Sequence, residues 1–290
     1  MNKPHRNSIF VERAKILAHQ AYAGEQYILT VQAPHMAEHA KPGQFAHIQC
    51  DEALPMRRPI SIMRTHKNGS VDFLYKVFGE GTRLLSRQPV DQKLSIMGPI
   101  GNSFESHMDK PRTLLIGGGV GIPPMVFLAD RLRAIKGAYQ PFVIMGSEVP
   151  FPFKAEPSKF MVPGVPSEAI AAMPLMEDWG IASRLASMQG YPGCFEGYVT
   201  DLARAWLNAL DDKQRQEVAV FACGPHPMLE AVAKLAREYR LPCQVSLEEF
   251  MACAVGGCAG CVVQVQTTKG PAMKRVCVDG PVFDAKTVFV

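Results

Sequence analysis

The sequence predicts a multi-domain chain in which an antiparallel β-barrel is followed by an α/β domain with a parallel sheet and by a small C-terminal module. Three observations predict this order. Short runs of alternating apolar and polar residues fill the first third of the 290 residues, continuous apolar runs alternate with helical patterns from Thr113 onward, and four of the eight cysteines lie at or after Cys253. We place the three parts at residues 1–108, 109–245 and 246–290.

The predicted barrel rests on strand-like runs between about residue 10 and residue 98. Residues 27–31, 45–49 and 71–75 alternate apolar and polar side chains, and turn-forming sequences separate these runs. Several short strands at this spacing are typical of a small antiparallel barrel.

The predicted α/β domain begins with a change of pattern at Thr113. Continuous apolar runs occur at residues 113–116, 142–145 and 218–222, and helical patterns at residues 125–135 and 228–239. Alternation of strands and helices predicts a parallel sheet with right-handed crossovers.

One segment between the second and third of these strands breaks the pattern. Residues 148–182 are rich in Pro, Met and Phe and have weak periodicity. We expect a long insertion here, with a short helix at residues 168–173.

Composition and charge argue against several classes of protein. The net charge is +4 and the basic residues are scattered, so the sequence predicts no nucleic-acid-binding face. The longest apolar run, residues 114–129, is interrupted by glycines and prolines and is too short to span a bilayer. Residues 1–13 contain no apolar stretch of a signal peptide, and we expect a cytoplasmic protein.

The C-terminal cysteines have the spacing of a metal-cluster site. Cys253, Cys258, Cys261 and Cys277 follow the order C-x4-C-x2-C…C, with which plant-type ferredoxins hold a [2Fe–2S] cluster. Glycines between the first three cysteines allow the backbone to approach anionic sulfur closely. Disulfides or buried thiols are one alternative, which the glycine-rich loop disfavours, and a zinc site is another, which the single C-x2-C pair disfavours.

Three sequences before Thr113 are candidates for binding a flavin nucleotide. Arg58 precedes Ser61 by three residues, which can place a guanidinium on a pyrophosphate and a hydroxyl near a flavin ring. The turn at residues 79–82 opens a helix and offers backbone N–H groups to a phosphate. A solvated arginine pair is the alternative for the first sequence, and the third, at residues 98–104, is equally consistent with a structural turn.

Two sequences in the α/β region are candidates for binding a second nucleotide. The glycine-rich loop at residues 117–124 lies between a predicted strand and helix, where glycines let the backbone approach a pyrophosphate. Cys223 and Gly224 follow a buried strand, at the sheet edge that faces the ligand crevice. Cys223 is either a neighbour of a nicotinamide ring or a small buried thiol, and His226 is more consistent with the start of a helix than with catalysis.

Taken in order, these motifs resemble the ferredoxin–NAD(P)+ reductase superfamily. The motifs that carry the resemblance are Arg58-Pro59-Ile60-Ser61, Gly79-Glu80-Gly81-Thr82, the loop at residues 117–124 and Cys223-Gly224-Pro225. The four C-terminal cysteines, together with residues 276–283, narrow the resemblance to the electron-transfer subunits of NAD-dependent dihydroorotate dehydrogenases. It extends from about residue 10 to residue 290.

The resemblance implies a barrel that binds FAD, an α/β domain that binds NAD(H) and a C-terminal module that binds a [2Fe–2S] cluster. It implies an oxidoreductase without a catalytic acid or base of its own, which passes electrons to or from an FMN-containing catalytic subunit of pyrimidine biosynthesis in a heterotetramer. The residues that it assigns to FAD are Arg58, Pro59, Ile60, Ser61, Gly79, Gly81 and Thr82. Those that it assigns to NAD(H) are Gly118, Gly119, Gly121, Cys223 and Gly224, and those that it assigns to iron are Cys253, Cys258, Cys261 and Cys277.

The chain departs from the family pattern in two places. An aromatic residue is common where Ile60 stands, so an aromatic contact to the flavin must come from elsewhere, and residues 248–251 are one source. The segment at residues 186–196 lacks the acidic, Gly/Ser-containing pattern that the family often shows, which leaves the choice between NAD and NADP open. A stand-alone reductase for a ferredoxin-type acceptor and a scaffold without nicotinamide turnover are the alternative functions.

Overall fold

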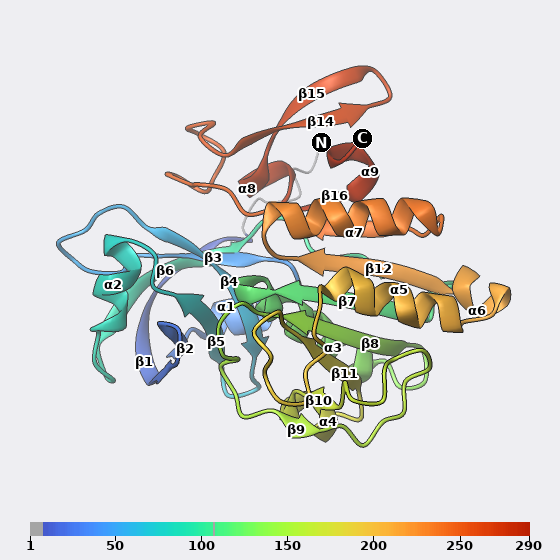
Figure 1. Cartoon of the computed structure of the whole chain (residues 1–290). Helices are drawn as coiled ribbons and strands as arrows, with labels where there is room; N and C mark the ends of the chain where they lie inside the picture. The colour runs from blue at the N-terminus through green and yellow to red at the C-terminus, as the bar shows by residue number, and fades with distance from the viewer. Residues whose placement is uncertain (1–7, 107) are drawn as a thin grey trace.

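The computed structural model describes residues 8–106 and 108–290. A barrel lies beside an α/β domain, and the C-terminal residues lie across the top of both (Figure 1). The predicted fold class is confirmed; of the predicted first part, residues 1–7 and 107 lie outside the described residues. None of the helices within the described ranges combines the length and the apolar character that crossing a membrane requires.

The barrel is a closed antiparallel sheet in the strand order β1-β2-β5-β4-β3-β6. Its strands are β1 Phe10–Tyr22, β2 Gln26–Gln32, β3 Phe45–Ile48, β4 Arg58–Thr65, β5 Ser70–Lys76 and β6 Lys93–Ile100, and its helices are α1 Pro34–His39 and α2 Glu80–Ser86. Side chains alternate between the two faces: in β4, Ile60 and Ile62 lie in the barrel core, so Pro59 and Ser61 take the outer face. The three predicted strand runs correspond to β2, β3 and β5.

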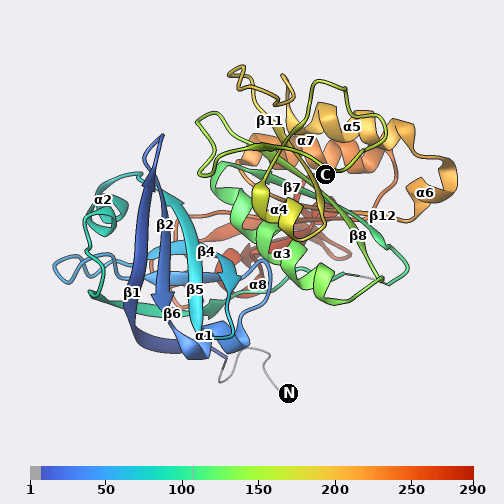
Figure 2. The ribbon, with the colours of Figure 1, turned by 90° about the horizontal axis from the view of Figure 1, so that it is seen from below.

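The α/β domain is built on a second sheet with the strand order β11-β8-β7-β12-β13-β16. Its parallel strands are β7 Arg112–Gly118, β8 Gln140–Gly146, β11 Ala182–Ala186, β12 Val218–Cys223 and β13 Cys243–Ser246. Helix α3 Ile122–Ala134 covers one face, while α5 Val199–Ala209 and α7 His226–Glu238 cover the other (Figure 2). Helix α3 begins three residues before the predicted start, because Pro123 and Pro124 are tolerated in a first turn, where their missing N–H groups would have no partner.

The segment between β8 and β11, predicted as an insertion, has little regular structure, and its predicted helix was misplaced. Strand β9 Glu156–Pro157 pairs with β10 Ala171–Ala172, and α4 spans Pro174–Asp178. The predicted helix at residues 168–173 is wrong, because residues 171 and 172 form the β10 pairing and a proline starts the helix. Buried Arg184 fastens the insertion by donating to the carbonyl of Phe160 at 2.6 Å, and buried Glu177 accepts a hydrogen bond from Ser158 Oγ at 2.7 Å.

The C-terminal module packs on both domains. It contains the hairpin β14 Val262–Thr267 and β15 Gly270–Arg275, the helices α8 Val276–Asp279 and α9 Ala285–Val288, and the strand β16 Val282–Asp284. Strand β16 extends the main sheet by pairing antiparallel with β13. Cys261 and Cys277 belong to the same core cluster as Phe45 of the barrel and Val245 of the sheet, so one continuous core holds the module in place.

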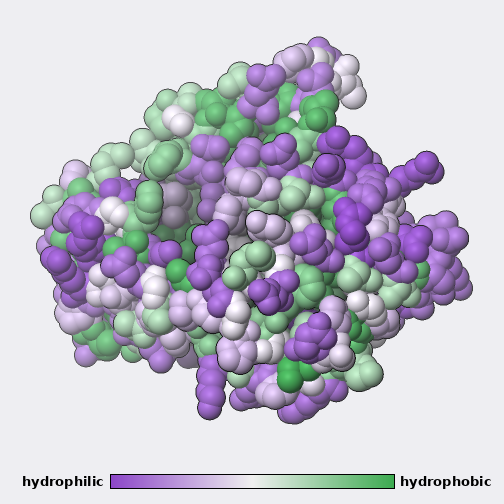
Figure 3. Space-filling model, viewed as in Figure 1, coloured by the Kyte–Doolittle hydropathy of each residue, from purple (hydrophilic) through white to green (hydrophobic). Residues whose placement is uncertain are grey.

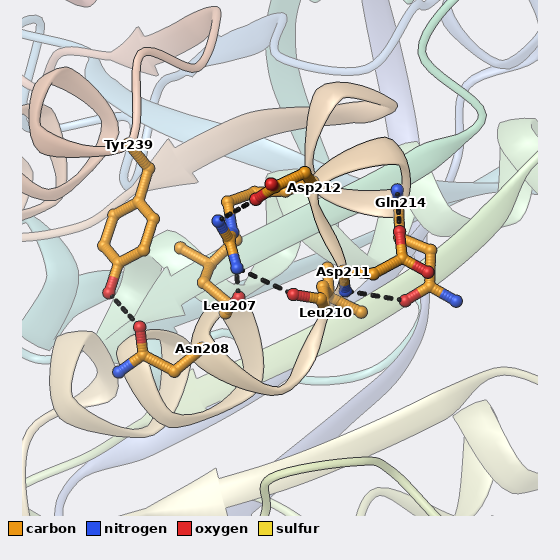
Figure 4. Close-up of polar contacts among 8 residues, drawn as sticks. Leu207, Asn208, Leu210, Asp211, Asp212, Gln214 and Tyr239 are labelled. Carbon is orange, nitrogen blue, oxygen red and sulfur yellow. Dashed lines mark hydrogen bonds and ion pairs between the residues drawn. The ribbon is translucent and has the colours of Figure 1, made fainter.

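The corner between α5 and α6 Asp212–Gln216 is closed by one arginine at the end of the domain away from the barrel (Figures 1 and 4). The guanidinium of Arg215 donates to the carbonyls of Leu207 at 3.2 Å and Leu210 at 2.7 Å. The Leu210 N–H also donates to the Leu207 carbonyl, and since the carbonyls at the end of α5 lack the donors of a continuing helix, the arginine acts as a side-chain cap. Tyr239 donates to Asn208 at 2.6 Å and ties the end of α7 to the same corner.

Candidate functional site

Arg58 and the α2 turn form a single cradle on the barrel. A methyl group at Gly81 would lie 2.6 Å from Arg58 Nε, so the guanidinium rests directly on the glycine. Arg58 Nη1 donates to the carbonyls of Met56 and Arg57 at 2.9 and 3.1 Å. Among the described residues no carboxylate pairs with Arg58, which leaves its other N–H groups available to an anionic ligand.

The α2 turn is closed by its own hydrogen bonds and leaves open space at its first glycine. Thr82 Oγ1 accepts from the Phe78 N–H at 2.7 Å, which closes the turn. Gly79 has φ of +82°, a conformation that glycine adopts at no steric cost, and no atom lies within 4 Å of the position of a Cβ. Phe78 is 85% exposed beside this turn. Sequence reasoning missed it, although an aromatic residue directly before a Gly-x-Gly turn was a visible signal.

Arg57, the neighbour of Arg58 in sequence, has a structural role. It donates to the carbonyl and the hydroxyl of Ser95, both at 2.7 Å, and to the carbonyl of His47 at 3.2 Å. Arg57 therefore ties the start of β4 to β3 and β6. Its side chain is not a solvated partner of Arg58, which was the alternative that the sequence left open. Ile60 lies in the barrel core, so only its backbone can meet a ligand, whereas Ser61 lies on the outer face.

The turn at residues 98–104 is structural. A Cβ at Gly101 would lie 2.3 Å from Pro281 Cδ, and the Gly101 carbonyl accepts from Gln44 Nε2 at 2.7 Å. Phe104 is buried and packs edge-on against Phe221, with ring centroids 5.8 Å apart. This turn joins the barrel to the sheet and to the C-terminal module.

The two predicted nucleotide loops meet at the carboxyl ends of β7 and β12. A Cβ at Gly121 would lie 2.2 Å from the carbonyl oxygen of Cys223. The Met228 side chain occupies the space beside Gly118 and Gly224, at 2.5 and 2.6 Å from their Cβ positions. The strand order reverses between β7 and β12, which is where open α/β sheets bind their ligands.

Gly119 is the glycine of this loop that faces open space. It has φ of +53° and no atom within 4 Å of its Cβ position, in contrast to Gly117, Gly118 and Gly121. Its backbone is therefore the part of the loop that a phosphate can approach. The two prolines in the first turn of α3 reduce the number of N–H donors that the helix offers.

Cys223 and Glu248 lie together at the same sheet edge. Cys223 is fully buried, and burial, reinforced by the charge of Glu248, raises its thiol pKa well above the usual value. Part of the Glu248 residue is exposed to solvent, but protein atoms surround its carboxyl group closely. The resulting loss of hydration raises the pKa of the carboxyl. The sequence contained a signal for the pairing, since Glu248 follows β13, the parallel neighbour of β12.

The four C-terminal cysteines form two pairs. Cys261 Sγ and Cys277 Sγ are 3.3 Å apart and both residues are buried, whereas Cys258 is exposed and its N–H donates to Cys253 Sγ at 3.4 Å. Burial would raise the pKa of Cys253, but N–H groups of the loop, including those of Val255 and Cys258, outweigh it and lower the pKa to about 7. Burial and the neighbouring Cys261 raise the pKa of Cys277 to about 12.

This arrangement fits a [2Fe–2S] cluster better than its alternatives. Such a cluster places two protein ligands on each of two irons, which two cysteine pairs provide. A structural zinc ion needs four ligands around one centre, and in the described part of the chain no three His, Cys, Asp or Glu side chains converge on one ion position. All eight cysteines lie in the described ranges, and none of them is part of a disulfide there.

The loop that carries the first three cysteines is held in an uncommon conformation. Ala254 and Ala259 have φ of +56° and +53°, values that non-glycine residues seldom adopt. These turns let N–H groups point at sulfur, as those of Cys258 and Gly260 do. Hydrophobic surface gathers over the C-terminal module and along its border with the barrel, around a hollow between the two (Figure 3).

Together, the cradle on the barrel, the loops at the sheet edge and the paired cysteines define an electron-transfer protein with a ferredoxin reductase-like fold. The model of the iron-sulfur cluster binding domain of dihydroorotate dehydrogenase B matches residues 248–289. The chain is 34% identical to the dihydroorotate dehydrogenase B (NAD(+)) electron transfer subunit of Caldanaerobacter subterraneus subsp. tengcongensis, over 95% of this chain and 97% of the relative. It is 33% identical to that of Geobacillus kaustophilus, over 96% and 98%. The chain belongs to this family of electron transfer subunits.

Solved structures agree on the fold. A chain of the NADH-dependent reduced ferredoxin-NADP oxidoreductase superposes with a TM-score of 0.75 at 24% identity, covering 96% of this chain and 90% of that one. The ferredoxin reductase in carbazole 1,9a-dioxygenase superposes with a TM-score of 0.62 at 21% identity, covering 81% and 67%. At these identities the likeness concerns the fold alone.

Proposed function

We propose that this chain is the electron-transfer subunit of an NAD-dependent dihydroorotate dehydrogenase and works with an FMN-containing catalytic subunit in pyrimidine biosynthesis. The observation that carries the proposal is the presence, in one chain of this family, of three sites fitted to FAD, a dinucleotide and a [2Fe–2S] cluster. When bound, these groups supply the exchange between two-electron hydride chemistry and single-electron transfer. The chain itself binds, orients and shields them.

Residues 1–108 would bind FAD. Arg58 would pair with the pyrophosphate, since its guanidinium is held at the α2 turn and has no carboxylate partner among the described residues. Gly81 leaves the room that the guanidinium needs, and the pre-folded turn at Gly79 and Thr82 presents the start of α2 to a phosphate. Ser61 would meet the flavin ring from the outer face of β4, together with the backbone of Pro59 and Ile60.

Residues 109–245 would bind NAD(H). Gly119 would approach the pyrophosphate, while Gly118, Gly121 and Gly224 keep the two loops in close contact. The raised pKa of Cys223 keeps its thiol neutral, so the residue brings no charge to the edge where a nicotinamide would lie.

Residues 246–290 would hold the cluster. Cys253 and Cys258 would bind one iron, and Cys261 and Cys277 the other. The first pair is the more exposed and is the side on which a partner subunit can approach. The proposal is completed by a heterotetramer of two such chains with two catalytic subunits, in a cytoplasm whose reducing conditions keep the cysteines out of disulfides.

Cofactor analysis and rapid mixing with NADH test this function. We expect about one FAD and about two irons per chain after anaerobic purification or reconstitution, and bleaching of both chromophores by NADH. A colourless protein that takes up neither group would contradict the proposal. Bleaching of neither chromophore would instead favour a scaffold, and rapid transfer to a ferredoxin without any catalytic subunit would favour a stand-alone reductase.

A further inference from the structure

One buried histidine lies between the barrel and the C-terminal module. His47 is the third residue of β3 and is 1% exposed. Its neighbours Ala46 and Ile48 belong to the barrel core, whereas Phe45 belongs to the core that includes Cys261 and Cys277. Because side chains alternate along a strand, His47 points out of the barrel, on the same side as Phe45.

The outer face that His47 occupies is the one proposed to meet the flavin. In the pairing of β3 with β4, His47 is opposite Pro59 and Phe45 is opposite Ser61. Residues opposite each other in an antiparallel pair project to the same face. His47 is therefore one step along the sheet from the Ser61 position.

The segment that leads to the cluster cysteines covers this histidine. The backbone of Met251 lies beside the imidazole, two residues before Cys253, and the backbone of Arg57 lies beside it as well. Neither ring nitrogen has a described partner at full hydrogen-bonding geometry, although the backbone of Met251 and of Arg57 lies close enough to favour a protonated ring. Folded proteins seldom leave buried ring nitrogens without partners, so this ring is a candidate for a role beyond packing.

The surroundings keep the ring uncharged. Burial, followed by the charge of Arg57, lowers the pKa of His47 to about 4, although the two backbone groups favour the protonated form. A neutral imidazole has one N–H donor and one acceptor. It can therefore bond to a main-chain carbonyl of the covering segment without placing a charge between the two cofactor sites.

We infer that His47 is a positioning residue that seats the segment leading to the cluster cysteines on the flavin face of the barrel and thereby sets electron transfer between the two sites. The inference rests on the proposed function. Its physical basis is that groups surrounding a metal site orient the ligands and tune their electronics without touching the metal. A side chain that merely filled space could be replaced by one of similar volume without changing either property.

Two variants and one control test the inference. His47→Leu keeps the volume but removes both nitrogens, and His47→Gln keeps a donor and an acceptor. His19→Gln is the control, because the His19 ring bonds to Tyr75 and to the Gln88 carbonyl within the barrel. Anaerobic rapid mixing with NADH follows flavin and cluster bleaching separately, and electron paramagnetic resonance of dithionite-reduced protein reports the cluster environment.

We expect His47→Leu to slow cluster reduction about 10-fold or more, in the range seen when groups around a metal site are removed, and to shift the resonance signal. Flavin reduction should stay within about twofold of the parent, since His47 does not touch the nicotinamide edge. His47→Gln should recover most of the cluster rate, and His19→Gln should match the parent.

A parent-like cluster rate and resonance signal in His47→Leu would overturn the inference. If that variant does not accumulate as folded protein, His47→Met, which also removes both nitrogens at similar volume, takes its place, and a parent-like signal and rate in it would overturn the inference equally. The dithionite measurement does not depend on NADH. If NADH never reduces the cluster of the unmutated protein, that result would count against the proposed function. The comparison of resonance signals between the unmutated protein and the His47 variants would still test the role of His47.

Discussion

Gly81 supports the guanidinium of Arg58, with the position of a Cβ only 2.6 Å from Arg58 Nε. The contact joins the first residue of β4 to the first turn of α2. It brings two motifs that are separate in the sequence into one cradle, which we propose binds an anion, and it explains why an alanine would not serve at position 81.

We expect Arg58→Ala to weaken FAD binding about 10- to 100-fold, because hydrogen bonds to a charged group contribute about 1.5–3 kcal/mol. Gly81→Ala should also weaken FAD binding, because the added methyl group displaces the Arg58 guanidinium. Titration of the apoprotein with FAD, followed by flavin fluorescence, measures both. Arg83→Ala is the control, since Arg83 is an exposed arginine of the same helix and pairs with Glu80 at 2.9 Å. Equal losses for Arg58 and Arg83 would contradict the cradle.

Two alanine substitutions in one loop should behave differently. Gly121→Ala would place a Cβ 2.2 Å from the Cys223 carbonyl oxygen, a backbone atom that cannot rotate away. We expect it to lower the free energy of unfolding by about 3 kcal/mol or more, at the upper end for overpacking. Gly119→Ala meets no atom and should cost about 1 kcal/mol for its positive φ, while raising the KM for NADH. Urea denaturation and NADH kinetics check this pair, and equal stability of the two variants would contradict the described packing.

Loss of one exposed cysteine should separate flavin reduction from onward transfer. Cys258→Ser should reduce the iron content from about two per chain towards zero, or leave an altered cluster, because one iron loses a thiolate ligand. NADH should still bleach the flavin, and transfer to the partner should fail. Cys194→Ser, which removes a free thiol of the β11–α5 loop, should keep its iron. Normal onward transfer in an iron-free Cys258→Ser protein would refute the relay role.

The stability of the protein should depend on the titration of His47. Its pKa is about 4 in the folded chain and about 6.5 when unfolded, so the unfolded chain binds the proton first as the pH falls. The free energy of unfolding should therefore decrease by about 3 kcal/mol between about pH 6.5 and about pH 4 on account of this residue, and be unaffected by it above that range. His47→Gln should remove this part of the slope. Denaturation curves at pH 7 and pH 4.5 give the difference, and identical slopes would rule the assignment out.

The insertion is fastened to the barrel through one buried glutamine. Gln26 is 2% exposed and its amide nitrogen donates to the carbonyls of Ala23 at 2.9 Å and Pro150 at 2.7 Å. Gln26→Ala should cost about 1–3 kcal/mol, because the Pro150 carbonyl loses its donor, and should speed proteolysis near residue 150. Gln32→Ala removes a half-buried glutamine of the same strand, whose side chain donates to the Asn68 carbonyl at the surface, and it should change neither stability nor proteolysis to this extent. Limited proteolysis and denaturation compare the two.

Local patterns in the sequence were sufficient for several strands and for recognising the cysteine spacing of a cluster module. The alternation in residues 27–31 and 71–75 predicted β2 and β5, and the spacing of Cys253, Cys258 and Cys261 predicted that they share a loop, because both patterns depend on neighbours within one strand or one loop. Cys277 reaches Cys261 only through the β14–β15 hairpin. The helix at residues 168–173 was misplaced for the opposite reason. There Ala171 and Ala172 of β10 pair with Pro157 and Glu156 of β9, in an earlier part of the chain. This pairing outweighs the weak local preference of residues 168–173 for a helix.

What the sequence by itself determined was the order of the three parts, the family and the motifs that we propose for each site. Tertiary structure alone decided which of two adjacent arginines is free, since Arg57 is held by Ser95 of another strand while Arg58 meets Gly81. It also decided the division of the cysteines into an exposed and a buried pair, and the burial of His47 beneath Met251. These facts depend on side-chain direction and on contacts between distant segments, which packing of the whole chain fixes and which no local pattern encodes.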